Sequence, residues 1–219
     1  PVNEAIGLPF TETTLADRLK AAGYRTAVFG KWHLGGGEKF HPMSRGFDEF
    51  FGFPGGDHSY HETQAATANP ILDGRQPVAI MPYLTDALGD RAVDFIRRQK
   101  SRPFFLYLAF NAVHTPMHAT EKYLTRFKNI ADPHSRTYAA MLSAMDDAIG
   151  RTVAAIRDEK LEEDTLFFFF SDNGGPTMQG TAINGASNGP LRGSQRQTWE
   201  GGLRVPFIVD CERQIPPGQ

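Results

Sequence analysis

The chain has 219 residues, of which 40% are hydrophobic and 22% are charged, and its formal net charge is −2. This composition is that of an ordinary folded domain, and the near-neutral charge excludes binding to nucleic acid by bulk positive charge. The longest apolar runs, FFLYLAF and LFFFF, fall well short of the roughly 20 residues that a membrane-spanning helix needs. We therefore expect one domain over residues 1–219, with no nucleic-acid partner and no membrane span.

One pattern occurs three times along the chain: a helical segment, then a short apolar strand, then polar residues. The first unit has a helix in TTLADRLKAAG (13–23) and the strand RTAVF (25–29). The second has a helix over 85–100 and the strand FFLYLAF (104–110). The third has a helix over 134–160 and the strand TLFFFF (165–170). An apolar stripe runs along this last helix: Tyr138, Met141, Leu142, Met145, Ile149, Val153 and Ile156.

The segments between these units have no apolar period. Residues 39–64 are rich in Gly, Pro, His and aromatic residues, and we interpret them as a long ordered loop. Residues 176–196 are similar, and TWEGGLRVPFIVD (198–210) then predicts a turn and a fourth strand. Apolar strands separated by helices predict an α/β fold with a doubly wound, mostly parallel sheet flanked by helices. The three apolar strands are expected to be neighbours in that sheet.

Polar residues follow each apolar strand, where a doubly wound sheet binds its ligands. They are Lys31 and His33 after the first strand, His114 after the second, and Asp172 and Asn173 after the third. Because the carboxyl ends of parallel strands meet at one edge, we expect these five side chains to line one pocket.

The chemistry of these residues fits an anion and a metal ion. Lysine and histidine bind anions and move protons, although a surface lysine and a structural histidine are the alternative at Lys31 and His33. Asp172 and Asn173 offer oxygen ligands for Ca²⁺ or Mg²⁺, with a simple Asx turn as the alternative. A lone histidine such as His114 is more often structural than catalytic. The sequence contains neither a G-x-S-x-G nucleophile elbow nor a phosphate-binding P-loop.

The remaining histidines carry no motif of their own. His58, His61 and His118 are interpreted as structural residues. The residues thus indicate cations and a metal around an anionic group, with the attacking group missing.

Four segments together resemble the sulfatase family, the type I formylglycine-dependent sulfatases. They are GYRTAVFGKWHLG, PFFLYLAFNAVHTP, FSDNGGP and LRGSQRQTWEGGLRVPF, in the order of the family and over nearly the whole chain. The resemblance implies an alkaline-phosphatase/sulfatase-like fold and a hydrolase of aryl or carbohydrate sulfate esters. It also implies a Ca²⁺ cofactor, with Mg²⁺ as the alternative, and a periplasmic or secreted location.

The resemblance also implies roles for individual residues. Lys31 and His33 would contact the sulfate and the nucleophile, and His114 would hold the sulfate or protonate the leaving oxygen. Asp172 and Asn173 would bind the metal.

Two departures from the family pattern change these expectations. The C/S-x-P-x-R motif that yields the formylglycine nucleophile, and an Asp-Asp pair of further metal ligands, are expected upstream of GKWH and are absent. Gln195 stands where the family usually has a lysine on the sulfate, and Arg196 is its cationic neighbour. We therefore expect a single sulfatase-like catalytic domain, truncated at both ends and inactive alone.

Two alternatives stay open. One is a catalytically silent sulfatase-like protein that binds sulfated glycans, and the other is a phosphatase or phosphonate-ester hydrolase of the same superfamily. The sequence decides neither the sulfate ester, small molecule or glycan, nor the oligomeric state.

Overall fold

The computed structural model describes residues 6–63, 69–178, 183–216 and 218. The helices are α1 (Leu15–Ala21), α2 (Leu84–Gln99), α3 (Glu121–Leu124), α4 (Pro133–Asp158) and α5 (Glu200–Leu203). The strands are β1 (Arg25–Lys31), β2 (Glu49–Phe53), β3 (His61–Thr63), β4 (Ile71–Asp73), β5 (Gln76–Val78), β6 (Ile80–Tyr83), β7 (Phe104–Ala109), β8 (Phe167–Phe170) and β9 (Phe207–Asp210). Short 3-10 turns lie at Glu38–Phe40, Pro42–Ser44, Thr125–Phe127 and Glu162–Asp164.

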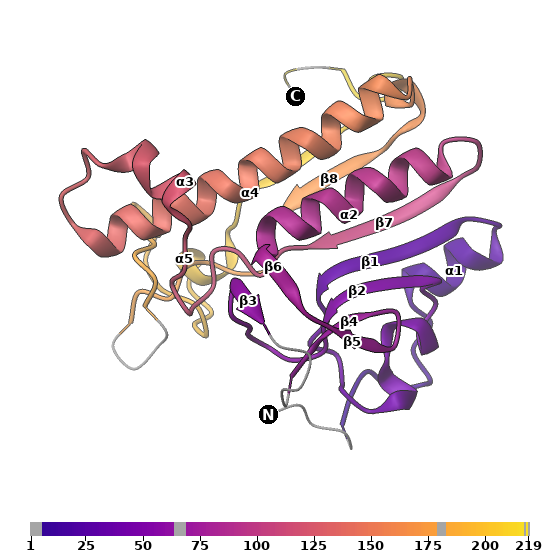
Figure 1. Ribbon diagram of the computed structural model, residues 1–219, viewed down its shortest axis with the longest axis horizontal. Helices are drawn as coiled ribbons and strands as arrows, with labels where there is room; N and C mark the ends of the chain where they lie inside the picture. Colours follow the sequence, from indigo (N-terminus) through magenta and orange to yellow (C-terminus); the bar gives the residue numbers. More distant parts are fainter. Residues whose placement is uncertain (1–5, 64–68, 179–182, 217, 219) are drawn as a thin grey trace.

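The main sheet has five strands in the order β5-β4-β2-β1-β7 (Figure 1). Strands β2, β1 and β7 are parallel, because β1 pairs in parallel with both β2 and β7. Strands β4 and β5 extend one edge in the antiparallel direction. The predicted α/β fold with a mostly parallel sheet flanked by helices is confirmed.

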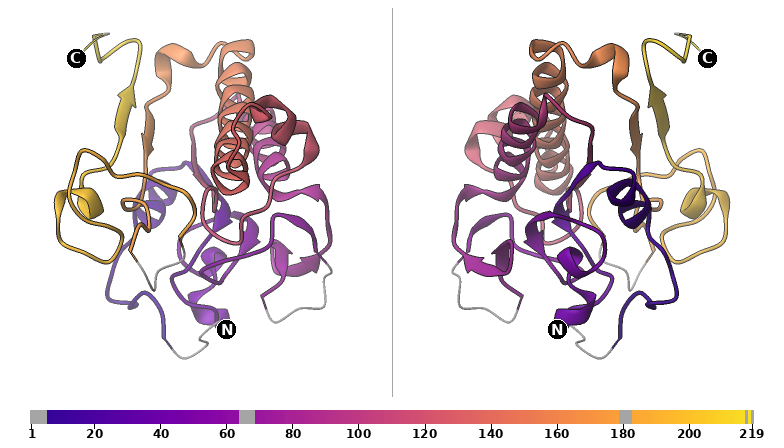
Figure 2. Two further views of the ribbon diagram at one scale, coloured as in Figure 1. Left: turned by 90° about the vertical axis from the view of Figure 1, so that its left-hand side faces the viewer. Right: turned by 90° about the vertical axis from the view of Figure 1, so that its right-hand side faces the viewer.

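Helices cover both faces of this sheet. On one face Leu84, Leu88 and Phe95 of α2 pack against Phe29 of β1 and Phe51 of β2. On the other face Ala16 of α1 packs against the alternate strand residues, among them Val28 and Phe50. Helix α4 lies along α2, so that the two long helices form one layer above the strands (Figures 1 and 2).

The predicted position of the third apolar strand is wrong. Strand β8 pairs with β9 alone, in an antiparallel two-stranded sheet that is separate from the main one. It still runs in the same direction as β7 (Figure 1), since α4 returns the chain as a crossover helix does. Among the described residues, the outer edge of β7 has no strand partner, and no backbone hydrogen bond joins β7 to β8.

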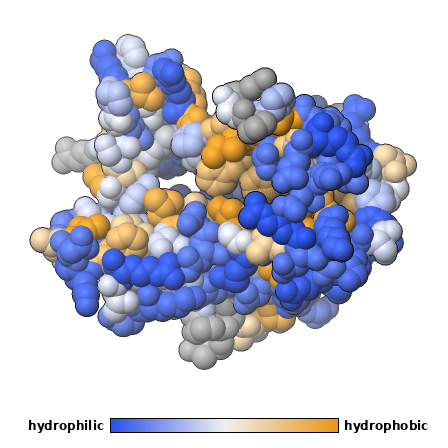
Figure 3. All heavy atoms as spheres, turned by 90° about the horizontal axis from the view of Figure 1, so that it is seen from above, coloured by the Kyte–Doolittle hydropathy of each residue, from blue (hydrophilic) through white to orange (hydrophobic). Residues whose placement is uncertain are grey.

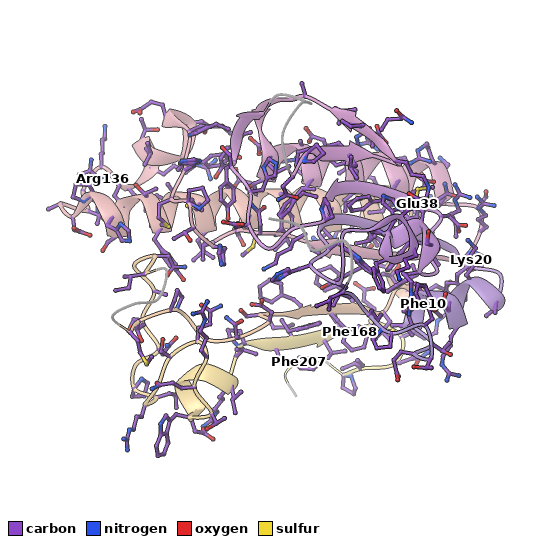
Figure 4. All side chains as sticks on the ribbon, turned by 90° about the horizontal axis from the view of Figure 1, so that it is seen from below. Phe10, Lys20, Glu38, Arg136, Phe168 and Phe207 are labelled. Carbon is purple, nitrogen blue, oxygen red and sulfur yellow. The ribbon has the colours of Figure 1, made fainter. Side chains whose placement is uncertain are left out.

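This separation leaves aromatic side chains uncovered. Phe168 and Phe170 of β8 are 52% and 54% exposed, and both lie beside Phe207 of β9. Figure 4 shows Phe168 and Phe207 next to each other on the small sheet. Tyr107 of β7 is 44% exposed in the same way. Strand β8 is thus apolar at every position and yet lies outside the main sheet of residues 1–219.

Two further expectations need correction. The predicted loop 39–64 contains β2, a central strand of the sheet, and it was missed because EFFGF is buried at nearly every position and shows no alternation.

The buried face of α4 consists chiefly of Ala140, Met141, Ala144 and Ala148. The predicted stripe is only partly buried, since Leu142 is 43% exposed. Small residues let α4 approach α2 closely, as the contact of Ala148 with Gly89 shows. None of the described helices is both long enough and apolar enough to cross a membrane.

Candidate active site

The candidate site lies at the carboxyl edge of the main sheet. Lys31 is the last residue of β1, and the neighbouring Gly30 pairs with Ala109, the last residue of β7. The segment that carries His114 therefore leaves the sheet beside Lys31. Asp172 and Asn173 follow the carboxyl end of β8. Because β8 runs in the same direction as β7, this end points the same way as the carboxyl end of β7.

The backbone around His33 is fixed in an unusual conformation. His33 has φ +54, in the left-handed region that few residues other than glycine adopt. The backbone N–H of His33 donates to Pro54 O over 3.1 Å, and that of Trp32 donates to Phe53 O. Trp32 is buried and its Nε1 donates to Phe40 O at 2.9 Å. The buried tryptophan thus anchors the turn, which leaves the His33 ring exposed.

The imidazole of His33 lies in a mixed electrostatic field. Its pKa is lowered, first by desolvation and next by the charge of Lys31. Asp57 raises this pKa, His114 lowers it and Asp172 raises it. Lys31, His114 and Asp172 are thus all near enough to His33 to influence its charge, although they come from three different strand ends.

His114 is held by its neighbours in a defined orientation. Its Nδ1 lies 2.6 Å from Thr115 O, and since a carbonyl only accepts, Nδ1 carries the proton. The buried Tyr60 hydroxyl donates to His114 O at 2.8 Å and to Asn111 O at 2.5 Å. Burial raises the pKa of Tyr60 far above its ordinary value, so this donor remains protonated. No hydrogen bond from a described residue reaches the Nε2 of His114.

The Asp172–Asn173 turn is shaped for oxygen ligands. The Asn173 amide donates from Nδ2 to Gly174 O at 3.0 Å, and no hydrogen bond from a described residue reaches its Oδ1. Asp172 is exposed and has no ion-pair partner within the described residues. Gly174 is required here, because a Cβ would stand 1.8 Å from Gly201 O.

These two residues supply only part of a metal site. In the described part of the chain no group of three or more His, Cys, Asp or Glu side chains is placed to hold a metal ion. The donor set of Asp172 and Asn173 fits a hard cation in kind, but calcium takes roughly six to eight oxygen ligands.

The segment 183–203 closes against this turn and against the His114 loop. The Gln195 N–H donates to Gly175 O at 3.1 Å, which places this residue beside the Asp172–Asn173 turn. The buried Asn184 donates from Nδ2 to Val113 O at 2.7 Å. Arg196 is exposed, with φ +72 and no ion pair in the described chain. Between this segment and α4 the surface is hollowed (Figure 3).

Several residues of this site have no signal in the sequence. Asp57 influences the charge of His33, and Gly56 touches its ring so closely that a Cβ would come within 2.8 Å of Nε2. Tyr60 and Asn184 position the His114 loop through hydrogen bonds that span 54 and 71 residues. Sequence reasoning found the long segment that carries Asp57 and Tyr60, but nothing local marks these residues.

Comparison with known proteins agrees with the resemblance. The family model described as Sulfatase matches residues 1–219. N-acetylgalactosamine-6-sulfatase of Sus scrofa is 36% identical over 97% of this chain and 42% of its own length. Arylsulfatase J of Mus musculus is 37% identical over 92% of this chain and 35% of its own. The chain thus spans less than half the length of these curated relatives.

Solved structures give the same result. The crystal structure of Ps i-CgsB in complex with k-i-k-neocarrahexaose has a TM-score of 0.90 and 35% identity, over 97% of this chain and 50% of that one. A protein of the alkaline phosphatase superfamily from Vibrio parahaemolyticus has a TM-score of 0.52 and 19% identity, which supports the fold alone. From its motifs, its fold and these comparisons, the chain belongs to the sulfatase family.

Proposed function

We propose that residues 1–219 carry the sulfate-binding part of an enzyme that hydrolyses sulfate esters. The observation that supports this most strongly is that β1, which ends at Lys31, pairs along its length with β7, from which the His114 loop leaves, while Asp172 is near enough to affect the pKa of His33. Three strand ends contribute these groups, as a doubly wound fold does at its ligand site.

The side chains divide the work by their chemistry. The Lys31 ammonium neutralises charge on the sulfate oxygens, and His33 holds the nucleophile and the sulfate beside it. The lowered pKa of His33 keeps its imidazole neutral at pH 7, so that it both accepts and donates hydrogen bonds. His114 presents Nε2 to the leaving oxygen, to which it gives a proton when it is charged.

Asp172 and Asn173 are proposed as metal ligands, through a carboxylate and through the Oδ1 of Asn173. The expected ion is Ca²⁺, which when bound stabilises negative charge that develops on the sulfate. The nucleophile is proposed to be a formylglycine outside residues 1–219. This chain alone should therefore bind sulfate esters without hydrolysing them.

The proposed substrates are carbohydrate sulfates. The relative at 36% identity is named N-acetylgalactosamine-6-sulfatase, and the similar solved structure holds neocarrahexaose. Aryl sulfates are a second candidate, since other relatives are arylsulfatases. A periplasmic or secreted location is proposed with this activity. Gln195 favours a second function, that of a silent sulfated-glycan binder, because it lacks the charge that a lysine would bring to the sulfate.

The test is an assay of the purified chain with p-nitrophenyl sulfate and added calcium, together with equilibrium dialysis of the same compound. We expect binding without release of p-nitrophenol, weakened by Lys31→Ala and unchanged by Lys128→Ala, an exposed lysine elsewhere. Turnover that survives repurification and disappears in Lys31→Ala would show that the chain contains its own nucleophile. Tighter binding of p-nitrophenyl phosphate would favour the phosphatase alternative.

A further inference from the structure

A pair of histidines lies beside the proposed site and takes no part in it. The rings of His61 and His118 stack with centroids 5.0 Å apart and planes at 25°. His61 begins β3, whereas His118 follows the His114 loop, so the pair joins two segments that lie 57 residues apart in the sequence. Both side chains are half-buried, so part of each ring faces solvent.

The pair has spare hydrogen-bonding capacity. The Nδ1 of His118 lies 3.4 Å from Ser59 Oγ, and no hydrogen bond from a described residue reaches its Nε2. Likewise, neither ring nitrogen of His61 has a hydrogen-bond partner within the described chain. No described carboxylate forms an ion pair with either ring. Two stacked imidazoles that form no ion pair with a described carboxylate, and whose ring nitrogens keep hydrogen-bonding capacity among the described residues, can donate hydrogen bonds to an oxyanion.

The position of the pair relative to the proposed site is fixed. Tyr60, next to His61 in sequence, donates to the His114 carbonyl, and Tyr83, the strand partner of His61, donates to the His118 carbonyl at 2.9 Å. Both tyrosines are fully buried. The loop from His114 to His118 is thereby held at both ends on the β3–β6 pair. Four residues of extended chain span at most about 14 Å, which sets an upper limit on the separation of the His114 and His118 backbones.

We propose that His61 and His118 form a subsite for a second anionic group, a sulfate or a carboxylate, next to the sulfate that is hydrolysed. The subsite rests on the proposed function, because it has meaning only if a sulfate ester lies at Lys31, His33 and His114. It assigns the substrate to polyanionic glycans rather than to singly charged sulfate esters. A hydrogen bond that these histidines donate is stronger to an anionic oxygen than to a neutral hydroxyl. The subsite would therefore favour substrates with a second anionic group.

The test measures the dissociation constants of three probes by titration calorimetry at pH 6. They are N-acetylgalactosamine 6-sulfate, N-acetylgalactosamine 4,6-disulfate, and a disaccharide that links glucuronic acid to N-acetylgalactosamine 6-sulfate. We expect at least one doubly charged probe to bind about tenfold tighter than the monosulfate, in keeping with a charge-assisted hydrogen bond. Which probe gains tells whether the second group is a sulfate or a carboxylate.

Variants locate the gain. His61→Gln and His118→Gln should each remove it and leave monosulfate binding unchanged, whereas His134→Gln, an exposed histidine at the start of α4, should change neither. Equal binding of all three probes, or a gain that persists in both variants, would overturn the subsite. Monosulfate binding that is absent, or indifferent to Lys31→Ala, would instead reject the proposed function. If a variant fails to fold, the ring ¹⁵N signals of the unaltered chain decide: a shift of His61 and His118 with a doubly charged probe alone supports the subsite, and its absence contradicts it.

Discussion

Gly30 and Ala109 approach each other so closely that a Cβ at Gly30 would stand 1.9 Å from the Ala109 carbonyl oxygen. Gly30 also has φ +121, which side chains rarely adopt. This contact lies one residue before Lys31 and joins the ends of β1 and β7, from which the candidate site is built.

Gly30→Ala should therefore destabilise the protein by at least about 3 kcal/mol, from backbone strain together with the steric clash. Gly150→Ala is the matched control, because Gly150 lies within α4 and an added Cβ meets nothing within 4 Å. That change should stabilise by about 0.4–1 kcal/mol through the chain entropy of the unfolded state. Urea unfolding measures the free energy of unfolding of both variants. Similar losses of stability in the two would show that the close contact at Gly30 does not cause the destabilisation.

The charge of His33 should respond in opposite directions to its two neighbours. Lys31 lowers the pKa of His33 and Asp172 raises it. Lys31→Ala should therefore raise the pKa of His33, and Asp172→Asn should lower it further. NMR titration of the imidazole measures the three values. A pKa that is the same in all three proteins would mean that Lys31 and Asp172 do not share the site of His33.

Stability should increase with pH below neutrality. His41 is buried, and its pKa is lowered from 6.5 by burial and by Arg75. Between this lowered pKa and 6.5 the unfolded state binds a proton that the folded state does not, so the free energy of unfolding rises with pH. One such histidine contributes at most about 1.4 kcal/mol per pH unit. Urea unfolding at several values between pH 5.5 and 7.5 measures how the free energy of unfolding changes with pH. This change should be smaller in His41→Gln, and an unchanged pH dependence would exclude His41 as its source.

Gln195→Lys should tighten sulfate binding. The backbone of Gln195 is hydrogen-bonded to Gly175, next to the Asp172–Asn173 turn, so a longer cationic side chain there is near the proposed sulfate. A charge-assisted contact of about 1.5–3 kcal/mol corresponds to a gain of roughly 10- to 150-fold. Gln197→Lys, two residues away and also half-buried, is the control for added charge. Equal gains in both variants would indicate a bulk effect and not a defined contact.

The sequence predicted what depends on local pattern. The helices α1, α2 and α4 and the strands β1, β7, β8 and β9 agree with the expected segments, because each carries its own apolar period or run and its own end signals. The polar residues at the strand ends were proposed by the same reasoning, although Asp172 and Asn173 follow β8, which lies outside the parallel sheet. Their functional roles stay predictions.

What the sequence did not predict depends on partners far along the chain. Strand β2 has no period, and only its pairing with β1 identifies it. The pairing of β8 was misplaced because FFFF is as apolar as a central strand, whereas its Phe168 is half exposed. The hydrogen bond from the Tyr60 hydroxyl to the His114 carbonyl joins residues 54 positions apart, and no local sequence pattern predicts it.

The central claim is that Lys31 and His114, from two strand ends, bind one sulfate. The most direct test is a double-mutant cycle of inorganic sulfate affinity at pH 6, measured by titration calorimetry for the unaltered chain, Lys31→Ala, His114→Ala and the double variant. Two groups on one ion should be coupled by at least about 0.5 kcal/mol, so the double variant should lose less than the sum of the single losses. Losses that add within about 0.3 kcal/mol, or sulfate binding that neither variant weakens, would contradict a shared site.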